Sequence, residues 1–370
     1  MTSRSERGRS AGSKPTVEWT LLLYMAGLKS AGPDGDGFAR AEARLVSELA
    51  NVEVGPNVQI YYEMSTNEGL RRGRISGNRP GLETIEKGRP TSPTSAEALK
   101  SFLDWVGEKF PASAKTALVV KGHGGGLERS ARRGEKSQYL GVRALRSALE
   151  GSHLGRVDVC GLDACDMGLL EIAYELRDVA AHVVATQSVE PTSAWPYKKS
   201  IELLGAGGVE PGPFAKFVAS ANKGAFLAAT DVKELDALLA SLSQIALRLR
   251  GVLRADPKRV ARVRDRLTSF GVENQYVDLK QLFSALGGVI GDDVLLQDAQ
   301  QELARDCSAP WPMALAGGTG AGGLSIFFPR SSGSSYLASY RQMRLAEKNH
   351  WGQFVTDFCS LSPGTPSPGS

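Results

Sequence analysis

Cysteine and histidine are scarce in this sequence of 370 residues, which holds four of each. No two cysteines have the C-x-x-C spacing typical of zinc and redox sites. So few cysteines in so long a chain do not make a disulfide framework, and no histidine has partners at ligand spacing. We therefore expect reduced thiols, a cytoplasmic location and no metal site.

Long apolar runs and a large excess of one charge are also missing. No window approaches the roughly 18 apolar residues of a membrane span, and the polar N-terminal segment lacks the apolar core of a secretory signal. The 44 basic and 40 acidic residues leave a net charge of only +4. We expect neither a membrane nor a nucleic-acid partner, and a monomer.

Motifs for nucleotide binding and serine hydrolysis do not occur in the strand and helix context that their chemistry requires. There is no G-x-x-x-x-G-K-[ST] string, and the tract AGGTGAGG opens a strand, whereas a dinucleotide turn opens a helix. The string HGGG resembles an oxyanion loop of lipases, but no G-x-S-x-G elbow follows a strand-like run. Both classes are excluded.

Short apolar runs that alternate with helix-period segments make up most of the chain. This pattern predicts an α/β three-layer sandwich with a mainly parallel central sheet, plus a helical C-terminal extension. The Gly, Arg and Pro-rich stretch Arg71–Pro93 is expected to be a turn-heavy excursion. Strands are expected at 19–27, 58–64, 116–126, 157–164, 181–188 and 323–329, and helices at 41–52, 95–110, 167–178 and 233–253.

Composition divides the chain into four parts. Residues 1–16 and 361–370 are Ser, Pro and Gly-rich and are expected to be disordered ends. Residues 17–209 are predicted to form the catalytic core, and residues 210–360 a helical part with a closing strand packed on that core.

Two loops that follow predicted strands carry candidate chemistry, because function in open α/β sheets gathers at the carboxyl ends of strands. The first holds His123 among glycines, and the second holds Cys165 between two aspartates. A thiol needs a base or a helix N-terminus to become nucleophilic, and Cys165 is expected at a strand-to-helix corner with Asp166 as a helix N-terminal charge. The amides of Gly124 and Cys165 are candidates for an oxyanion hole.

The other cysteines and histidines are interpreted as structural. A cysteine in an apolar stretch is more often an inert small hydrophobe than a nucleophile. This group comprises Cys160, Cys307, Cys359, His153, His182 and His350.

With His-Gly after one strand and Asp-Ala-Cys after the next, the chain resembles the clostripain family of cysteine peptidases, which are relatives of the caspases. The matching pieces run in order from about residue 17 to 360. They are YMAG, KGHGGG, GLDACDMGLLEIAYELRDVAAHVVATQ, a Pro...Trp-x-Tyr tract, GLSIFFP and YRQMRLAEKNHWGQFVTDF.

The resemblance implies a caspase-like endopeptidase with a Cys165/His123 dyad that cleaves after a basic P1 residue, Asp163 being one acid of the P1 pocket. The tract that holds the family's second acid reads PTSAW here, which puts Ser193 at that position. Glu190 is a candidate to compensate, and Trp195 joins the substrate-binding residues.

Relatives of this kind are often zymogens cut between the His and Cys loops, so self-cleavage is expected within 128–138. The candidate sites are Arg129, Arg132, Arg133 and Lys136. The resemblance makes Ca²⁺ dependence possible, although nothing in the sequence requires a cofactor. Substrates would be proteins or peptides, with a dedicated intracellular effector in bacterial defence as one possibility. The altered PTSAW tract leaves a weakly active regulatory or interaction module as the alternative.

Overall fold

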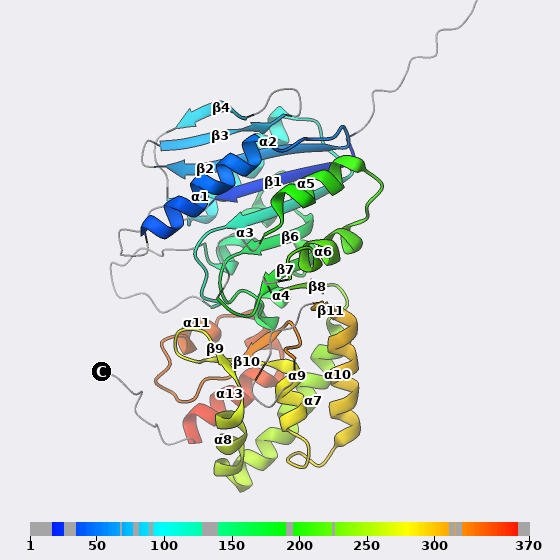
Figure 1. Cartoon of the computed structure of the whole chain (residues 1–370). Helices are drawn as coiled ribbons and strands as arrows, with labels where there is room; N and C mark the ends of the chain where they lie inside the picture. The colour runs from blue at the N-terminus through cyan, green and yellow to red at the C-terminus, as the bar shows by residue number, and fades with distance from the viewer. Residues whose placement is uncertain are drawn as a thin grey trace, which may run out of the picture.

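The structure is a computed structural model, and it describes residues 17–25, 35–66, 69–76, 81–88, 92–127, 140–189, 195–223, 226–310, 315 and 320–361. Its main feature is a nine-stranded sheet with the order β11-β8-β7-β6-β5-β1-β2-β3-β4 (Figure 1). The five central strands are parallel, which confirms the predicted mainly parallel α/β sheet. They are β1 (Trp19–Met25), β2 (Val58–Thr66), β5 (Lys115–Lys121), β6 (Val157–Asp163) and β7 (Ala180–Thr186).

Helices cover both faces of the sheet, because each face carries its own buried apolar cluster. One face packs against α1 (Gly35–Ala50), α5 (Tyr197–Ala206) and α6 (Pro211–Ser220). The other packs against α2 (Ala96–Lys109), α3 (Val142–Gly151) and α4 (Leu170–Leu176). The three predicted layers are therefore present.

Ser95 is the N-cap of α2, at the start of the helix that the sequence predicts over residues 95–110. Ser95 Oγ accepts a hydrogen bond from the Ala98 amide at 3.2 Å, and Leu99, Phe102 and Leu103 lie on the buried face of the helix.

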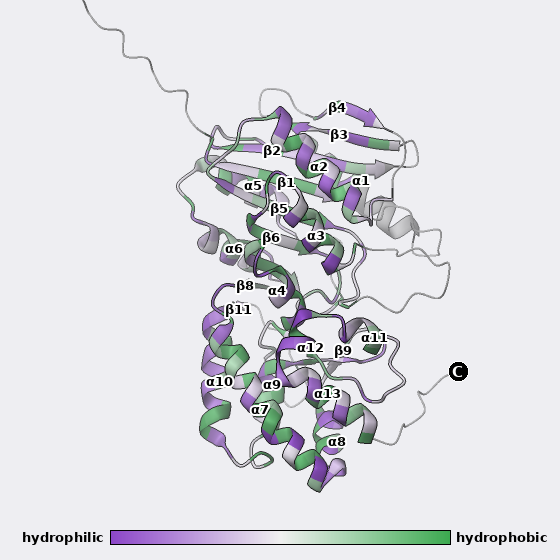
Figure 2. Cartoon of the chain, turned by 180° about the vertical axis from the view of Figure 1, so that it is seen from behind, coloured by the Kyte–Doolittle hydropathy of each residue, from purple (hydrophilic) through white to green (hydrophobic). Residues whose placement is uncertain are grey.

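The prediction of turns over Arg71–Pro93 was wrong. The strands β3 (Gly69–Ile75) and β4 (Leu82–Gly88) continue the sheet in antiparallel pairing beyond β2. Ion pairs across the strands accommodate their charges: Arg72 Nε lies 2.6 Å from Glu63 Oε2, and Arg74 Nε lies 2.7 Å from Glu83 Oε2. Hydrophilic residues run along most of the edge strand β4 (Figure 2), as suits an edge exposed to water.

The opposite edge of the sheet comes from the C-terminal half of the chain. Strand β8 (Leu227–Asp231) pairs antiparallel with β7, and the short β11 (Cys307–Ser308) pairs antiparallel with β8. The sheet thus crosses the boundary that was expected at residue 209.

The rest of the C-terminal half lies below the sheet in Figure 1 and is mostly helical, around a small antiparallel sheet. That sheet contains β9 (Ser269–Phe270), β10 (Tyr276–Asp278) and β12 (Ser325–Phe327), so the predicted closing strand is shorter than expected. The helices of this part of the chain are α7 (Asp236–Ala255), α8 (Pro257–Arg266), α9 (Leu279–Ala285), α10 (Asp293–Asp306), α11 (Leu337–Tyr340), α12 (Arg344–Lys348) and α13 (His350–Leu361).

The small sheet is joined directly to the chain beyond β6. The Ser325 amide donates to the Gly168 carbonyl at 2.8 Å, and the Gln187 side chain bonds Ser325 Oγ and Asp278 Oδ2 at 2.8 and 2.9 Å. One buried apolar cluster runs from Leu118 of β5 to Phe327 of β12. Within the described ranges, no helix has the length and apolar character needed to cross a bilayer.

Candidate active site

The strands β5 and β6 are parallel neighbours that end side by side. Lys121 is paired in register with Asp163, and the Gly122 amide donates to the Asp163 carbonyl at 3.3 Å. His123 therefore leaves the sheet edge next to the turn that carries Cys165. This is the juxtaposition that the two loop sequences predict.

The backbones of these two loops are in contact. A β-carbon added at Gly124 would lie 2.3 Å from the Cys165 carbonyl oxygen and 2.8 Å from the Cys165 nitrogen. Only glycine fits at so close an approach, which explains the residue after His123. The contact brings together the backbones of the two residues whose amides were predicted to bind an oxyanion.

Cys165 differs from the other three cysteines in exposure. It is half-buried, whereas Cys160, Cys307 and Cys359 are buried. Burial raises the pKa of the Cys160 and Cys307 thiols to about 12 and that of Cys359 to about 11, so these three remain protonated near neutral pH. Their structural interpretation fits this environment.

Cys165 lies in a turn and not, as predicted, at a corner where the strand leads directly into a helix. Helix α4 begins at Leu170, not at Met167, so its N-terminus does not lie directly beside the thiol. Asp166 is not a helix N-terminal charge: it has φ = 57°, and its amide donates to the Ser188 carbonyl at 2.9 Å. Burial raises the pKa of the Asp166 carboxyl to about 6, against a hydrogen bond from the Gly271 backbone.

Tyr276 of β10 braces the histidine loop, a role that the sequence analysis missed. Its hydroxyl donates to the Gly125 carbonyl and accepts from the Leu127 amide, both at 2.8 Å. A β-carbon at Gly126 would lie 2.5 Å from this hydroxyl, so the loop fits closely over it. No local motif reveals a contact between positions 151 residues apart in the sequence.

Asp163 is enclosed and already has two partners. Its Oδ2 accepts from Lys121 Nζ at 2.7 Å and from the Tyr197 hydroxyl, and the side chains of Asp163 and Lys121 are 3% and 6% exposed. Burial raises the pKa of the Asp163 carboxyl, while the Lys121 ammonium and the Tyr197 hydroxyl act against this shift. The family resemblance predicts that this acid binds substrate, and no sequence motif predicts a role for Lys121.

A comparison of the chain with protein-family models identifies the group to which it belongs. The model described as the clostripain family matches residues 43–286. The chain belongs to the clostripain family. It is therefore a cysteine-type peptidase, as the His-Gly and Asp-Ala-Cys loops predicted.

Solved structures with the same fold agree with this membership of the clostripain family. A secreted C11 cysteine protease from Bacteroides thetaiotaomicron, "iotapain", is 18% identical, with coverage of 90% of this chain and 99% of that chain and a TM-score of 0.67. An inactive zymogen C11 protease from Parabacteroides distasonis is 17% identical, with coverage of 90% and 99% and a TM-score of 0.70. The likeness confirms the caspase-like fold. A search of curated proteins found no match.

The remaining predicted site residues of this clostripain-family peptidase fall into two groups. Trp195 is 7% exposed, and its ring packs on Gly161 of β6, where an added β-carbon would lie 2.3 Å from Trp195 Cη2. Glu190 and Ser193 lie outside the described residues. The four candidate self-cleavage positions also lie outside them: Arg129, Arg132, Arg133 and Lys136.

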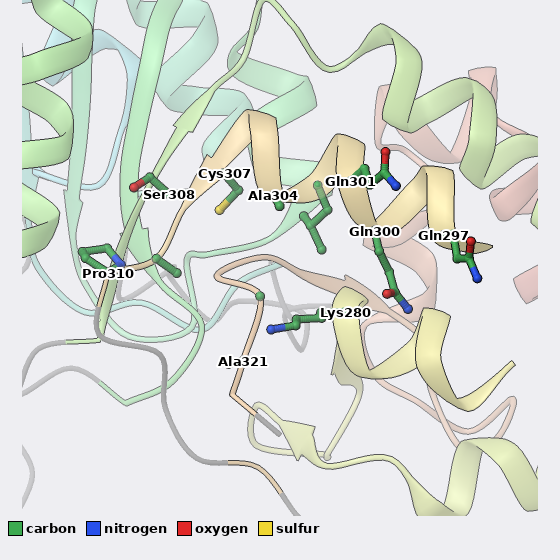
Figure 3. Close-up of a pocket in the computed structure, with 12 residues that line it drawn as sticks. Lys280, Gln297, Gln300, Gln301, Ala304, Cys307, Ser308, Pro310 and Ala321 are labelled. Carbon is green, nitrogen blue, oxygen red and sulfur yellow. The ribbon is translucent and has the colours of Figure 1, made fainter. Parts of the chain in front are cut away.

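A hollow whose lining includes neither His123 nor Cys165 offers little chemistry for peptide hydrolysis. It has a volume of about 600 Å³ and lies among α9, α10 and β11 (Figure 3). Its lining side chains are mainly carboxamides and apolar groups, with Lys280 and the buried thiol of Cys307. Across the described part of the chain, no group of three or more His, Cys, Asp or Glu side chains is arranged to hold a metal ion.

Proposed function

We propose that this peptidase cleaves proteins or peptides internally by means of a Cys165/His123 dyad. His123 accepts the thiol proton as Cys165 Sγ attacks the scissile carbonyl carbon, and the amides of Gly124 and Cys165 stabilise the oxyanion. His123 then protonates the leaving amine, and water hydrolyses the thioester to free the enzyme. The observation that carries the proposal is the backbone contact of Gly124 with Cys165 at the ends of adjacent parallel strands.

The test compares purified wild-type protein with Cys165→Ala and His123→Ala variants on a peptide library. We expect both substitutions to abolish cleavage. Cys359→Ala is the matched control, because its buried thiol lies in α13 and should not react. Cleavage that persists in Cys165→Ala would overturn the dyad.

We also propose that the chain is made as a precursor and cuts itself within residues 128–138. The supporting facts are the position of this segment between the His123 and Cys165 loops and the zymogen described for the Parabacteroides protein. Wild-type protein should yield two fragments on incubation, and Cys165→Ala should remain a single chain.

The reaction itself is proposed to need no metal, because thiolate and imidazole supply the nucleophile and the base. Any effect of Ca²⁺ would then act on the fold or on activation. Addition of a chelator to self-processed enzyme is expected to leave kcat unchanged. The proposed natural substrate is an intracellular effector protein, which proteomic mapping of new N-termini in cells with wild-type or Cys165→Ala enzyme would identify.

A further inference from the structure

We propose that Lys121 closes the P1 site to charged side chains by occupying Asp163, so that this enzyme cleaves after uncharged residues. The inference rests on the proposed function, since it concerns the side chain next to the bond that Cys165 attacks. It departs from the expectation of a basic P1 residue.

The Lys121–Asp163 pair lies where a P1 side chain would enter, for the following reason. Side chains alternate along a strand, so Gly161 and Asp163 of β6 point to one face. Cys165 follows in the turn after β6, and two residues of chain span at most about 7 Å. A substrate joined to Cys165 through its P1 carbonyl therefore has its side chain within reach of Asp163. Trp195 against Gly161, and Tyr197 against Asp163, lie on the same face.

The pair presents no net charge to that side chain. Lys121 Nζ and Asp163 Oδ2 are 2.7 Å apart, and both side chains are more than nine-tenths buried. Whether the proton is on the amine or on the carboxyl, the sum of the two groups is zero.

Displacement of Lys121 by a substrate arginine is expected to be costly. To bind the Asp163 carboxylate, the arginine would have to displace Lys121. The buried Lys121 ammonium would then lack its counter-ion and lie beside a second cation. An acidic P1 residue meets the same obstacle, because Asp163 holds the ammonium. Uncharged side chains avoid both costs, and the rings of Trp195 and Tyr197, whose centroids are 6.3 Å apart, give the surroundings of the pair an apolar character.

The matched experiment uses irreversible peptide probes that differ only in P1, with Leu, Arg or Asp in that position. The second-order rate of Cys165 labelling is measured for wild type, Lys121→Met, Asp163→Asn and Lys115→Met. Lys115 is the control, since it lies at the other end of β5 in an ion pair with Glu210, also at 2.7 Å. Both lysines belong to one strand and pair with a carboxylate, but Glu210 is 68% exposed whereas Asp163 is 3% exposed, so the control isolates the effect of the buried pair.

The expected result is that wild type and Lys115→Met react at least about tenfold faster with the Leu probe than with the Arg probe. Lys121→Met frees the carboxylate and should change the Arg-to-Leu ratio by about 100-fold in favour of Arg. Asp163→Asn frees the ammonium and should favour the Asp probe instead. A loss of packing alone would slow all three probes together, so the opposite shifts identify a role in specificity.

A wild-type preference for the Arg probe would overturn the inference, and so would an unchanged Arg-to-Leu ratio in Lys121→Met. If an Arg preference disappeared in Glu190→Gln, the determinant would be that acid and not the pair. Absence of Cys165 labelling by every probe, with folded protein, would overturn the proposed function and remove the basis of the inference.

Discussion

At the scale of single residues, the close contact of the two loops requires that position 124 has no side chain. A methyl group in Gly124→Ala would meet backbone atoms of Cys165, which cannot move aside as a flexible side chain could. The two loops would have to separate, and a misplacement of about 1 Å costs on the order of 100-fold in rate. We expect a loss of that size in kcat/KM, measured on the best library peptide.

The control for this change is Gly251→Ala in helix α7. Apart from the neighbouring backbone of the helix itself, no heavy atom of the described residues lies within 4 Å of an added β-carbon there, and alanine favours helix by about 1 kcal/mol. This variant should keep full activity and gain slightly in stability. Equal activity of the two variants would refute the role of the close approach.

The residues that the sequence predicted are those whose partners follow from strand order alone. Cys165 and His123 could be joined because parallel strands end at one edge of a sheet. The pairing of Lys121 with Asp163 could not be predicted, because it depends on strand register, which two apolar runs do not specify. Asp166 was misassigned because the helix begins three residues later than its apolar pattern indicates.

At the scale of elements, β10 supports the loop that holds His123 through one hydroxyl group, that of Tyr276. Tyr276→Phe removes the bonds to Gly125 and Leu127 and leaves the ring in place. We expect the unfolding free energy to fall by about 1–3 kcal/mol and kcat to fall well below wild type, since buried backbone groups lose their partner. Denaturant titration and kinetics below the midpoint measure the two effects separately.

Tyr61→Phe is the control for this hydroxyl, because its bond to Gln59 Oε1 at 3.2 Å lies on β2, away from the loop. It should leave kcat unchanged. An unaltered kcat in Tyr276→Phe would show that the loop keeps its shape without the brace.

Self-cleavage between β5 and β6 gives a further prediction for the P1 site. If the Lys121–Asp163 pair excludes basic residues, the cut within 128–138 should follow an uncharged residue such as Ser130, Ala131 or Gly134. Intact-mass analysis of the two fragments locates the bond. Cuts only after Arg129, Arg132, Arg133 or Lys136 would support the basic preference instead.

Among the elements, the strands missed by the sequence analysis were those whose stability depends on partners. Apolar runs identified β1, β2, β5, β6 and β7 because parallel strands are buried on both faces. The charges and glycines of β3 were interpreted as turns, whereas its burial comes from pairing with β2 and from the Arg72–Glu63 ion pair. Such cross-strand pairing cannot be derived from one segment alone.

At the scale of the whole molecule, stability should depend on pH through Glu171 of α4. Its side chain is fully buried, and burial raises the pKa of its carboxyl from 4.5 to about 7. A folded-state pKa above the unfolded value means that the contribution to stability is present below about pH 4.5 and is lost as the pH rises through 7. The loss is on the order of 3 kcal/mol.

Glu171→Gln should therefore flatten the fall in unfolding free energy between pH 5 and pH 8, as measured by urea denaturation. Glu63 contributes in the same direction, because burial raises the pKa of its carboxyl to about 7, so part of the slope should remain. Glu97, exposed in the first turn of α2, is the control, and Glu97→Gln should keep the wild-type slope. A wild-type slope in Glu171→Gln would contradict this account.

Fold class and enzyme class could be predicted for the whole molecule because strand and helix patterns and two loop motifs are local. The cytoplasmic location and the monomeric state stay predictions. The arrangement of the C-terminal half could not be predicted, because contacts such as that of Gln187 with Asp278 and Ser325 join distant segments.

Strands β8 and β11 belong to the large sheet, so the chain cannot be cut before them without exposing a sheet edge. A fragment that ends at residue 209 would leave β7 as a bare edge, with its N–H and C=O groups open to pairing with other chains. Such a fragment is expected to self-associate into insoluble aggregates, although it would contain both His123 and Cys165.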